Sequence, residues 1–139
     1  MIRIDETRDL AHPFEIRRIV FVEGQGVPVE EEQDEHDATA LHLLAFDRDR
    51  PVGTARILLA DGYGKIGRVA VLEEARGKGI GAALIRAAVE RLRAEAGIRE
   101  ARLGAQIHAL AFYERLGFEA HGPVFDDAGI PHRAMRLAL

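Results

Sequence analysis

The chain has 139 residues, 47% of them hydrophobic, and a formal net charge of -4 at pH 7. We therefore expect one domain over residues 1–139 with a core of its own, and a surface unsuited to nucleic acid. The absence of cysteine excludes a disulfide framework, a thiol nucleophile and a cysteine-based zinc site.

No segment of the sequence predicts a membrane or metal partner. The N-terminal residues are too polar for a signal peptide, and no apolar run approaches the roughly 20 residues of a membrane-spanning helix. We expect a cytoplasmic protein. The six histidines form no cluster at ligand spacing, so we expect no metal site.

The N-terminal third is predicted to contain one strand, one helix and a long connection. Residues 1–5 alternate as a short strand, and Pro13 suits the first turn of a helix over residues 11–22. Glycines and a proline end this helix. The segment between Gly24 and Thr39 has no sustained period, which indicates an ordered loop or a single helical turn.

Three antiparallel strands are predicted next, over residues 41–46, 52–59 and 65–72, with turn-forming residues between them. An amphipathic helix follows, because Ile80, Leu84, Ile85, Ala88 and Leu92 recur on one face, and Gly97 ends it.

Shorter elements complete the chain. We expect a strand over residues 101–103, a short helix over 108–116, and two final strands over 118–125 and 132–137 that flank a turn. The mixed order predicts an α/β fold with a mostly antiparallel sheet. The strands ending near Leu72 and Gly104 should be parallel neighbours, joined by the long helix.

Charge is distributed unevenly along the chain. Residues 23–37 contain seven acids and no lysine or arginine, whereas residues 76–102 contain seven bases and three acids. The basic region should attract an anionic ligand. The acidic run either attracts a cationic ligand or is a solvated loop surface.

A glycine-rich segment, Arg76-Gly77-Lys78-Gly79-Ile80-Gly81-Ala82, opens the long helix. Glycine lets an anion approach the backbone closely, and the first amides of a helix lack internal partners and carry the positive end of the macrodipole. Phosphate binds such a turn well. The segment therefore predicts a phosphate-binding loop.

Alternatives to this interpretation are separated by spacing. A Walker loop needs Ser or Thr after its lysine, and none follows Lys78. A Rossmann fingerprint can be placed on Gly77, Gly79 and Ala82, but five residues separate Gly77 from the preceding strand, and the next strand lacks a ribose-binding acid. A glycine-rich turn without a ligand is the third alternative.

The pattern Arg-x-x-Gly-x-Gly, with Arg76, Gly79 and Gly81 in the defining places, resembles the acetyl-CoA loop of the GNAT N-acetyltransferases. A second block, residues 106–118, resembles the C-terminal signature of that family, which contains Tyr-Glu-x-x-Gly-Phe. The N-terminal segment 20–28, with Asp37 and His42, looks like the ElaA-type branch.

The resemblance implies an acyl-CoA N-acyltransferase fold, with helices on both faces of the sheet and a splayed parallel strand pair. The pantetheine arm would pair with the backbone of Val69 and Val71 in the split, and the pyrophosphate would bind the amides from Gly77 to Ala82. The expected cofactor-binding residues are Val69, Ala70, Val71, Arg76, Gly77, Lys78, Gly79, Ile80, Gly81, Ala82, Gln106 and Phe112. The family more often has Asn near Gln106.

Acetyl transfer needs a neutral amine, although an alkyl ammonium has a pKa of about 10.4, and the leaving thiolate benefits from an acid. Tyr113 matches the family's tyrosine and is the expected acid; packing beside Phe112 is the alternative role. Glu23 is our first candidate for handling the amine proton. His42, His108 and an acid from residues 30–37 remain open for that role.

We expect Arg68, His42 and Asp37 near the acceptor. Arg68 could clamp a substrate carboxylate or join a strand salt bridge, and His42 could instead be a histidine satisfied within the core. The resulting hypothesis is direct transfer of acetyl from acetyl-CoA to a primary amine of a small molecule or peptide. A noncatalytic acyl-CoA sensor is the alternative, and a homodimer would suit the fold.

Overall fold

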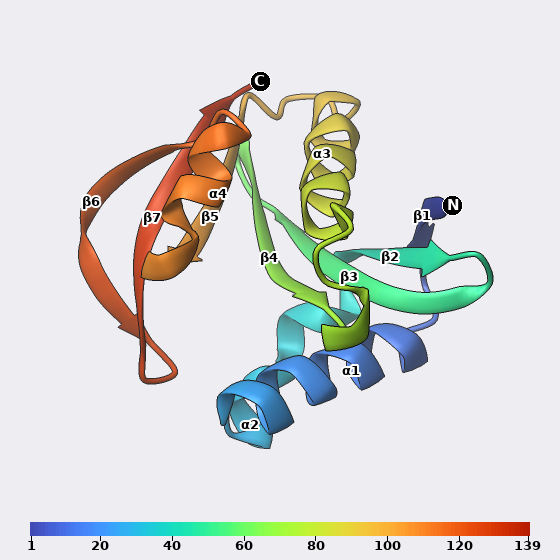
Figure 1. Ribbon diagram of the computed structural model, residues 1–139. Coiled ribbons are helices and arrows are strands. Elements are labelled where there is room, and N and C mark those ends of the chain that lie inside the picture. The colour runs from blue at the N-terminus through green and yellow to red at the C-terminus, as the bar shows by residue number, and fades with distance from the viewer.

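The computed structural model describes residues 1–139, which form one seven-stranded sheet with helices on both of its faces (Figure 1). The strands are β1 (Ile2–Thr7), β2 (Leu41–Asp47), β3 (Arg50–Leu59), β4 (Tyr63–Val71), β5 (Glu100–Gln106), β6 (Glu119–Asp127) and β7 (Ile130–Ala138). The α-helices are α1 (Ala11–Arg17), α2 (Val29–Glu32), α3 (Ile80–Arg93) and α4 (Leu110–Arg115). None of these helices has both the length and the apolar character that crossing a bilayer requires.

The sheet has the strand order β1-β2-β3-β4-β5-β7-β6. Every neighbouring pair is antiparallel except β4 and β5, which are parallel and joined by α3. This pair is held together only at its start, where Tyr63, Gly64 and Lys65 pair with residues 100–102. Beyond Lys65 the strands diverge, as Figure 1 shows between β4 and β5. The predicted mixed sheet with a splayed parallel pair is confirmed.

A bulge in β4 lies at the point of divergence. Thr54 of β3 pairs with Ala70 and Arg56 pairs with Gly67, so two residues of β4, Arg68 and Val69, face one residue of β3. Arg68 has a φ of 49°, in the left-handed region that is costly for a residue with a Cβ. The bulge bends β4 away from β5 and re-aims the Arg68 side chain.

The two faces of the sheet bury different helices. Side chains alternate along β2, so Leu43 and Ala45 join the core beneath α3, while Leu44 joins a second cluster with Ile16 and Val20. The buried face of α3 is the one that its 3.6-residue period predicts, and Leu84, Ala88 and Leu92 are fully enclosed. Opposite faces of one sheet thus support the N-terminal segment and the glycine-rich loop.

The largest differences from the predicted element boundaries are in three places. The helix predicted over residues 11–22 is α-helical only to Arg17 and continues as a π-helical segment, Arg18–Glu23. The connection before β2 contains α2 and a short 3-10 helix, Glu35–Ala38. Strand β5 runs to Gln106, past the predicted end at residue 103, because backbone pairing with β7 continues over its whole length.

Candidate active site

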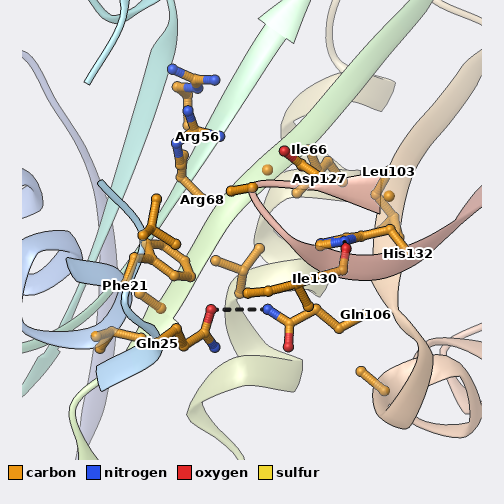
Figure 2. A pocket seen from close by; sticks show the side chains of 18 of the residues that line it. Phe21, Gln25, Arg56, Ile66, Arg68, Leu103, Gln106, Asp127, Ile130 and His132 are labelled. Carbon is orange, nitrogen blue, oxygen red and sulfur yellow. Dashed lines mark hydrogen bonds between the residues drawn. The ribbon is translucent and has the colours of Figure 1, made fainter. Parts of the chain in front are cut away.

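A cavity of about 520 Å³ occupies the split between β4 and β5. Its wall combines the π-helical segment, the bulged part of β4, β5, α4 and the β6–β7 hairpin. Figure 2 shows Phe21, Gln25 and Arg68 on one side of this cavity and Gln106 and His132 on the other. The wall is mixed, with apolar strand residues and several charged or polar groups, as in small-molecule sites.

At the start of α3, six consecutive backbone N–H groups, from Gly77 to Ala82, donate to no group of the chain; the first bond is from Ala83 to Gly79 O at 3.0 Å. Gly77 and Gly79 have φ values of 80° and 78°, which only glycine adopts without strain. The dipole of α3 adds positive potential at this end. We call residues 77–82 the amide cradle.

The side chains around the amide cradle lie in different surroundings. Arg76 lines the cavity and its Nε donates to Val71 O at 3.0 Å. Lys78 points outward, with Nζ 3.5 Å from Asp47 Oδ2. Ile80 is 1% exposed and belongs to the core. Phe112 packs against Gly81, where an added Cβ would lie 3.6 Å from its ring.

The edge of β4 that faces the split is the second backbone feature of the site. Ala70 pairs with Thr54, and the Leu72 amide donates to Val52 O at 2.9 Å, so β3 takes up one side of this stretch. The other side, at Val69 to Val71, has no strand partner because β5 has diverged. All three residues line the cavity. An extended amide-bearing ligand could add to this edge as a strand does.

Tyr113 and Gln106 close the opposite wall. Tyr113 of α4 lines the cavity, and burial raises the pKa of its phenol. Its ring packs edge-on against Phe112 and Phe118. Gln106 Nε2 donates to Gln25 Oε1 at 3.1 Å, the dashed contact in Figure 2, and His108 Nε2 lies 2.7 Å from Gln106 Oε1.

Behind the cavity lies a cluster of three arginines and three carboxylates, which we call the ion cluster: Arg17, Arg56, Arg68, Glu32, Asp34 and Asp37. Arg17 is 1% exposed and grips both Glu32, at 3.0 Å, and Asp37, at 2.8 Å. Burial opposes the charged forms, but hydrogen bonds from Arg17 and the Asp34 amide hold the Asp37 pKa well below its usual range.

The ion cluster fixes the connection 24–39 against the bulge of β4. Arg68 Nε donates to Glu32 O at 3.1 Å and forms an ion pair with Glu32 Oε2 at 3.0 Å. Arg56 Nη1 binds Asp34 Oδ1 at 2.7 Å. Burial, with the neighbouring charge of Arg56, lowers the Arg68 pKa. Three elements that are far apart in the sequence are thereby locked together beside the cavity.

Several predicted site residues lie away from the cavity wall. Glu23 is exposed and forms an ion pair with Arg18. Asp37 and His42 are buried, with His42 Nε2 3.0 Å from Asp37 O. The polar groups of Asp37 and His42 bond within the protein, and neither residue lines the cavity. The acidic run is divided: Glu32, Asp34 and Asp37 belong to the ion cluster, whereas Glu30, Glu31 and Glu35 are exposed.

The wall residues that were not expected from the sequence include Phe21, Asp127, Ile130 and His132. The last two strands flank the β6–β7 turn, and Phe125 and His132 are cross-strand partners whose rings stack at 5.8 Å. Their equal spacing from the turn was the available signal. That the hairpin folds over the cavity depends on the sheet order and could not be obtained from local pattern.

A split parallel strand pair beside a glycine-rich helix start defines a class, the acyl-CoA N-acyltransferases. The crystal structure of an acyl-CoA N-acyltransferase from Pseudomonas aeruginosa matches with a TM-score of 0.87 and 30% identity, covering 99% of both chains. The sequence profile of the acetyltransferase (GNAT) domain matches residues 20–139. The chain belongs to the GNAT acetyltransferase family.

Within the family, the relatives point to the ElaA-like branch. ElaA of Escherichia coli K12 is 34% identical over 125 residues, which cover 87% of this chain and 82% of that protein. Its crystal structure matches with a TM-score of 0.87 and 31% identity over 99% of each chain. The uncharacterized N-acetyltransferase YjcF of Bacillus subtilis 168 is 39% identical over 127 residues, 91% of this chain and 90% of that protein.

A more distant structure has the same fold. A GNAT family acetyltransferase from Elizabethkingia anophelis, crystallised with acetyl-CoA bound, matches with a TM-score of 0.79 and 17% identity, covering 99% of this chain and 98% of that chain.

Proposed function

We propose that this protein is an N-acetyltransferase that moves the acetyl group of acetyl-CoA directly onto a primary amine of a small molecule or peptide. The observation that carries the proposal is the pairing of two unsatisfied backbone features. The amide cradle, residues 77–82, has free N–H groups, and the adjacent edge of β4 has no strand partner. Val71 and Arg76 connect the two along the cavity wall.

These features fit the chemistry of coenzyme A. Free amides at a helix N-terminus suit a pyrophosphate, and an unpaired strand edge suits the amide groups of a pantetheine arm. Val69, Ala70, Val71, Gln106 and Arg76 would bind along the split, and Gly77 to Ala82 would bind the phosphates. The Elizabethkingia neighbour, which has acetyl-CoA bound, supports this donor.

The bound donor would supply an activated acetyl thioester, and the chain would supply orientation and proton transfer. Tyr113 is the proposed acid for the departing thiolate. A phenol with the ordinary pKa of about 10 is protonated at neutral pH, and burial raises the pKa of Tyr113 further, so Tyr113 has a proton to donate. Holding both reactants in one cavity replaces a bimolecular encounter by an oriented one.

The acceptor would bind at the end of the cavity formed by the π-helical segment, Arg68 and the β6–β7 hairpin. Apolar wall residues such as Phe21 and Ile130 would cover its hydrocarbon part. Asp127 forms no ion pair within the chain and lines this end, so it could attract an ammonium group. The ion cluster would keep Arg68 in place, which gives it a positioning role in addition to any substrate contact.

The direct test is thiol release from acetyl-CoA in the presence of polyamines, aminoglycosides, amino acids and peptides with free N-termini. We expect one acceptor class to accelerate thiol release well above the rate without amine, and the acetylated amine to be found by mass spectrometry. Acetyl-CoA binding without acceleration by any amine would instead favour the acyl-CoA sensor. Tighter binding of NAD than of acetyl-CoA would favour the dinucleotide alternative.

A further inference from the structure

We propose that His132 is the base that takes the proton from the acceptor amine. This inference rests on the proposed acetyltransferase function and adds a residue that sequence reasoning did not identify. His132 lies on β7, lines the cavity and is 9% exposed. In Figure 2 its ring extends from the β7 side toward the middle of the cavity.

The backbone fixes the tautomer of His132. Its Nδ1 lies 2.7 Å from Ile130 O, and a carbonyl oxygen only accepts, so Nδ1 must carry a hydrogen. In the neutral ring, Nε2 then has a free lone pair. No group of the chain forms a hydrogen bond with Nε2, and Nε2 is not fully enclosed by protein. Nε2 is therefore an open acceptor on the cavity.

His42, another histidine considered as the base, differs from His132 in the accessibility of its free ring nitrogen. Its ring is also held by a backbone carbonyl, with Nε2 3.0 Å from Asp37 O. Its remaining nitrogen, Nδ1, is enclosed by protein and has no partner. A substrate proton cannot reach it. Glu23, our sequence candidate, is outside the cavity wall and already paired with Arg18. Of these three groups, only His132 presents a free acceptor to the cavity.

The surroundings of His132 keep the ring rigid and in position. Phe125 stacks on it, with 5.8 Å between ring centres and 28° between planes. Gly104 makes room for this stack, because an added Cβ there would lie 3.2 Å from the Phe125 ring and 4.0 Å from His132 Cδ2. Gln106 is the cross-strand partner of His132 on β5. The proposed base thus lies on the β5–β7 strand pair, which forms one wall of the split.

The other charged or titratable groups of the cavity wall come from every element around it: Glu31, Glu32, Arg56, Lys65, Arg68, Arg76, His108, Tyr113 and Asp127. Glu32 and Arg56 are committed to the ion cluster, as is Arg68. His108 lies 2.7 Å from Gln106 Oε1. Asp127 is on the same hairpin as His132 and would hold an ammonium beside it.

The protons and bonds balance as follows. The ammonium gives one proton to His132 Nε2, and the neutral nitrogen forms a bond to the acetyl carbon as the carbon–sulfur bond breaks. The thiolate takes a proton from Tyr113. The second nitrogen proton returns to Tyr113 through solvent, and His132 releases its proton to solvent. The products are the N-acetylated amine, coenzyme A and one proton.

The first test reads the ring itself and requires no turnover. Two-bond nitrogen–proton NMR correlations of the wild-type protein with its histidines neutral should show Nδ1 of His132 bearing the hydrogen and Nε2 unprotonated. A predominant Nε2–H tautomer would overturn the proposal, because the only free nitrogen could then not accept a proton.

The second test uses His132→Gln with the best amine from the thiol-release panel. Because positioned proton transfer contributes roughly 10²–10⁴-fold, we expect kcat/KM to fall at least about 100-fold and the acidic limb of its pH profile to disappear. Acetyl-CoA affinity and the thermal midpoint should be nearly unchanged. The control is His121→Gln, on β6 and outside the cavity wall, with wild-type kinetics.

The two proposals fail differently. If the wild-type protein acetylates an amine and His132→Gln retains its rate, or loses rate while keeping the acidic limb, the assignment of His132 is overturned and the acetyltransferase function stands. If the wild-type protein binds acetyl-CoA but acetylates no amine, the proposed function is overturned and the role of His132 falls with it.

Discussion

The two halves of the cavity are built from different materials. Under the proposed function, the donor half presents backbone: the unpaired edge of β4 on the cavity wall and, next to Arg76, the amide cradle at residues 77–82. The acceptor half presents side chains from the π-helical segment, Arg68 and the β6–β7 hairpin, supported by the buried ion cluster. A backbone site tolerates many side chains, whereas a side-chain site changes with each substitution. Under the proposed function, we therefore expect single substitutions to alter acceptor binding more readily than donor binding.

Breaking the support of the acceptor half should have the largest effect. Arg17→Met leaves Glu32 and Asp37 buried with too little positive charge, so we expect the free energy of unfolding to fall by about 3–5 kcal/mol. Urea denaturation would measure this. The matched control is its neighbour Arg18→Met, whose ion pairs with Glu15 and Glu23 are exposed; its midpoint should barely move. Equal losses in the two variants would contradict a special role for the ion cluster.

The second prediction concerns the chemistry between the two halves. Tyr113→Phe removes the proposed acid and keeps the aromatic packing with Phe112 and Phe118. We expect kcat to fall about 100-fold, with acetyl-CoA affinity retained. Steady-state kinetics and calorimetry would measure these. Tyr63→Phe is the control, since Tyr63 contacts Arg102 outside the cavity. Full turnover by Tyr113→Phe would remove Tyr113 from the mechanism.

The third prediction tests the donor half alone. Gly79 and Gly97 have φ values of 78° and 81°, and an added Cβ at either meets nothing within 4 Å. Alanine at each should cost about 1 kcal/mol in stability through backbone strain. Only Gly79→Ala distorts the amide cradle, so it should weaken acetyl-CoA binding about tenfold, or roughly 1.4 kcal/mol. Calorimetric titration separates the two; equal affinities would contradict the cradle.

The smallest predicted effect is a pH dependence. The Asp37 pKa is lower in the folded protein than in the unfolded chain, where it is near 3.9. Its stabilisation should therefore be complete above about pH 4 and be lost as pH falls toward the folded pKa. Compared with Asp37→Asn, the wild-type protein should lose stability more steeply below about pH 4. Parallel curves of unfolding free energy against pH would contradict the strong pairing of Asp37.

The difference between the backbone features and the side-chain features of the site also determines how much of it the sequence could predict. The amide cradle could be predicted because alternating glycines precede a periodic helix, and the positive φ values at Gly77 and Gly79 require glycine there. The splayed strand pair followed from the resemblance, and the order of strands and helices supported it. Features of this kind depend on residues that are close together in the sequence, so the sequence alone can predict them.

The acceptor half depends on contacts between distant segments. For the acidic run the sequence left open a cation-attracting segment or a solvated loop surface. It did not predict the ion cluster, because the partners of Glu32, Asp34 and Asp37 come from one helix and two strands. The π-helical continuation of α1 has no simple sequence signal. His132 lies at the cavity because β7 lies between β5 and β6 in the sheet. Local periodicity does not specify this strand order.

One measurement tests the central claim most directly. The protein is incubated with acetyl-CoA that carries an isotopic label in its acetyl group and with each amine of the panel, and the amines and thiol are quantified by mass spectrometry. We predict that one amine class recovers the label on nitrogen, with one equivalent of free coenzyme A per amide formed. Label that stays on coenzyme A, or appears only as acetate, with every amine would contradict the acetyltransferase function.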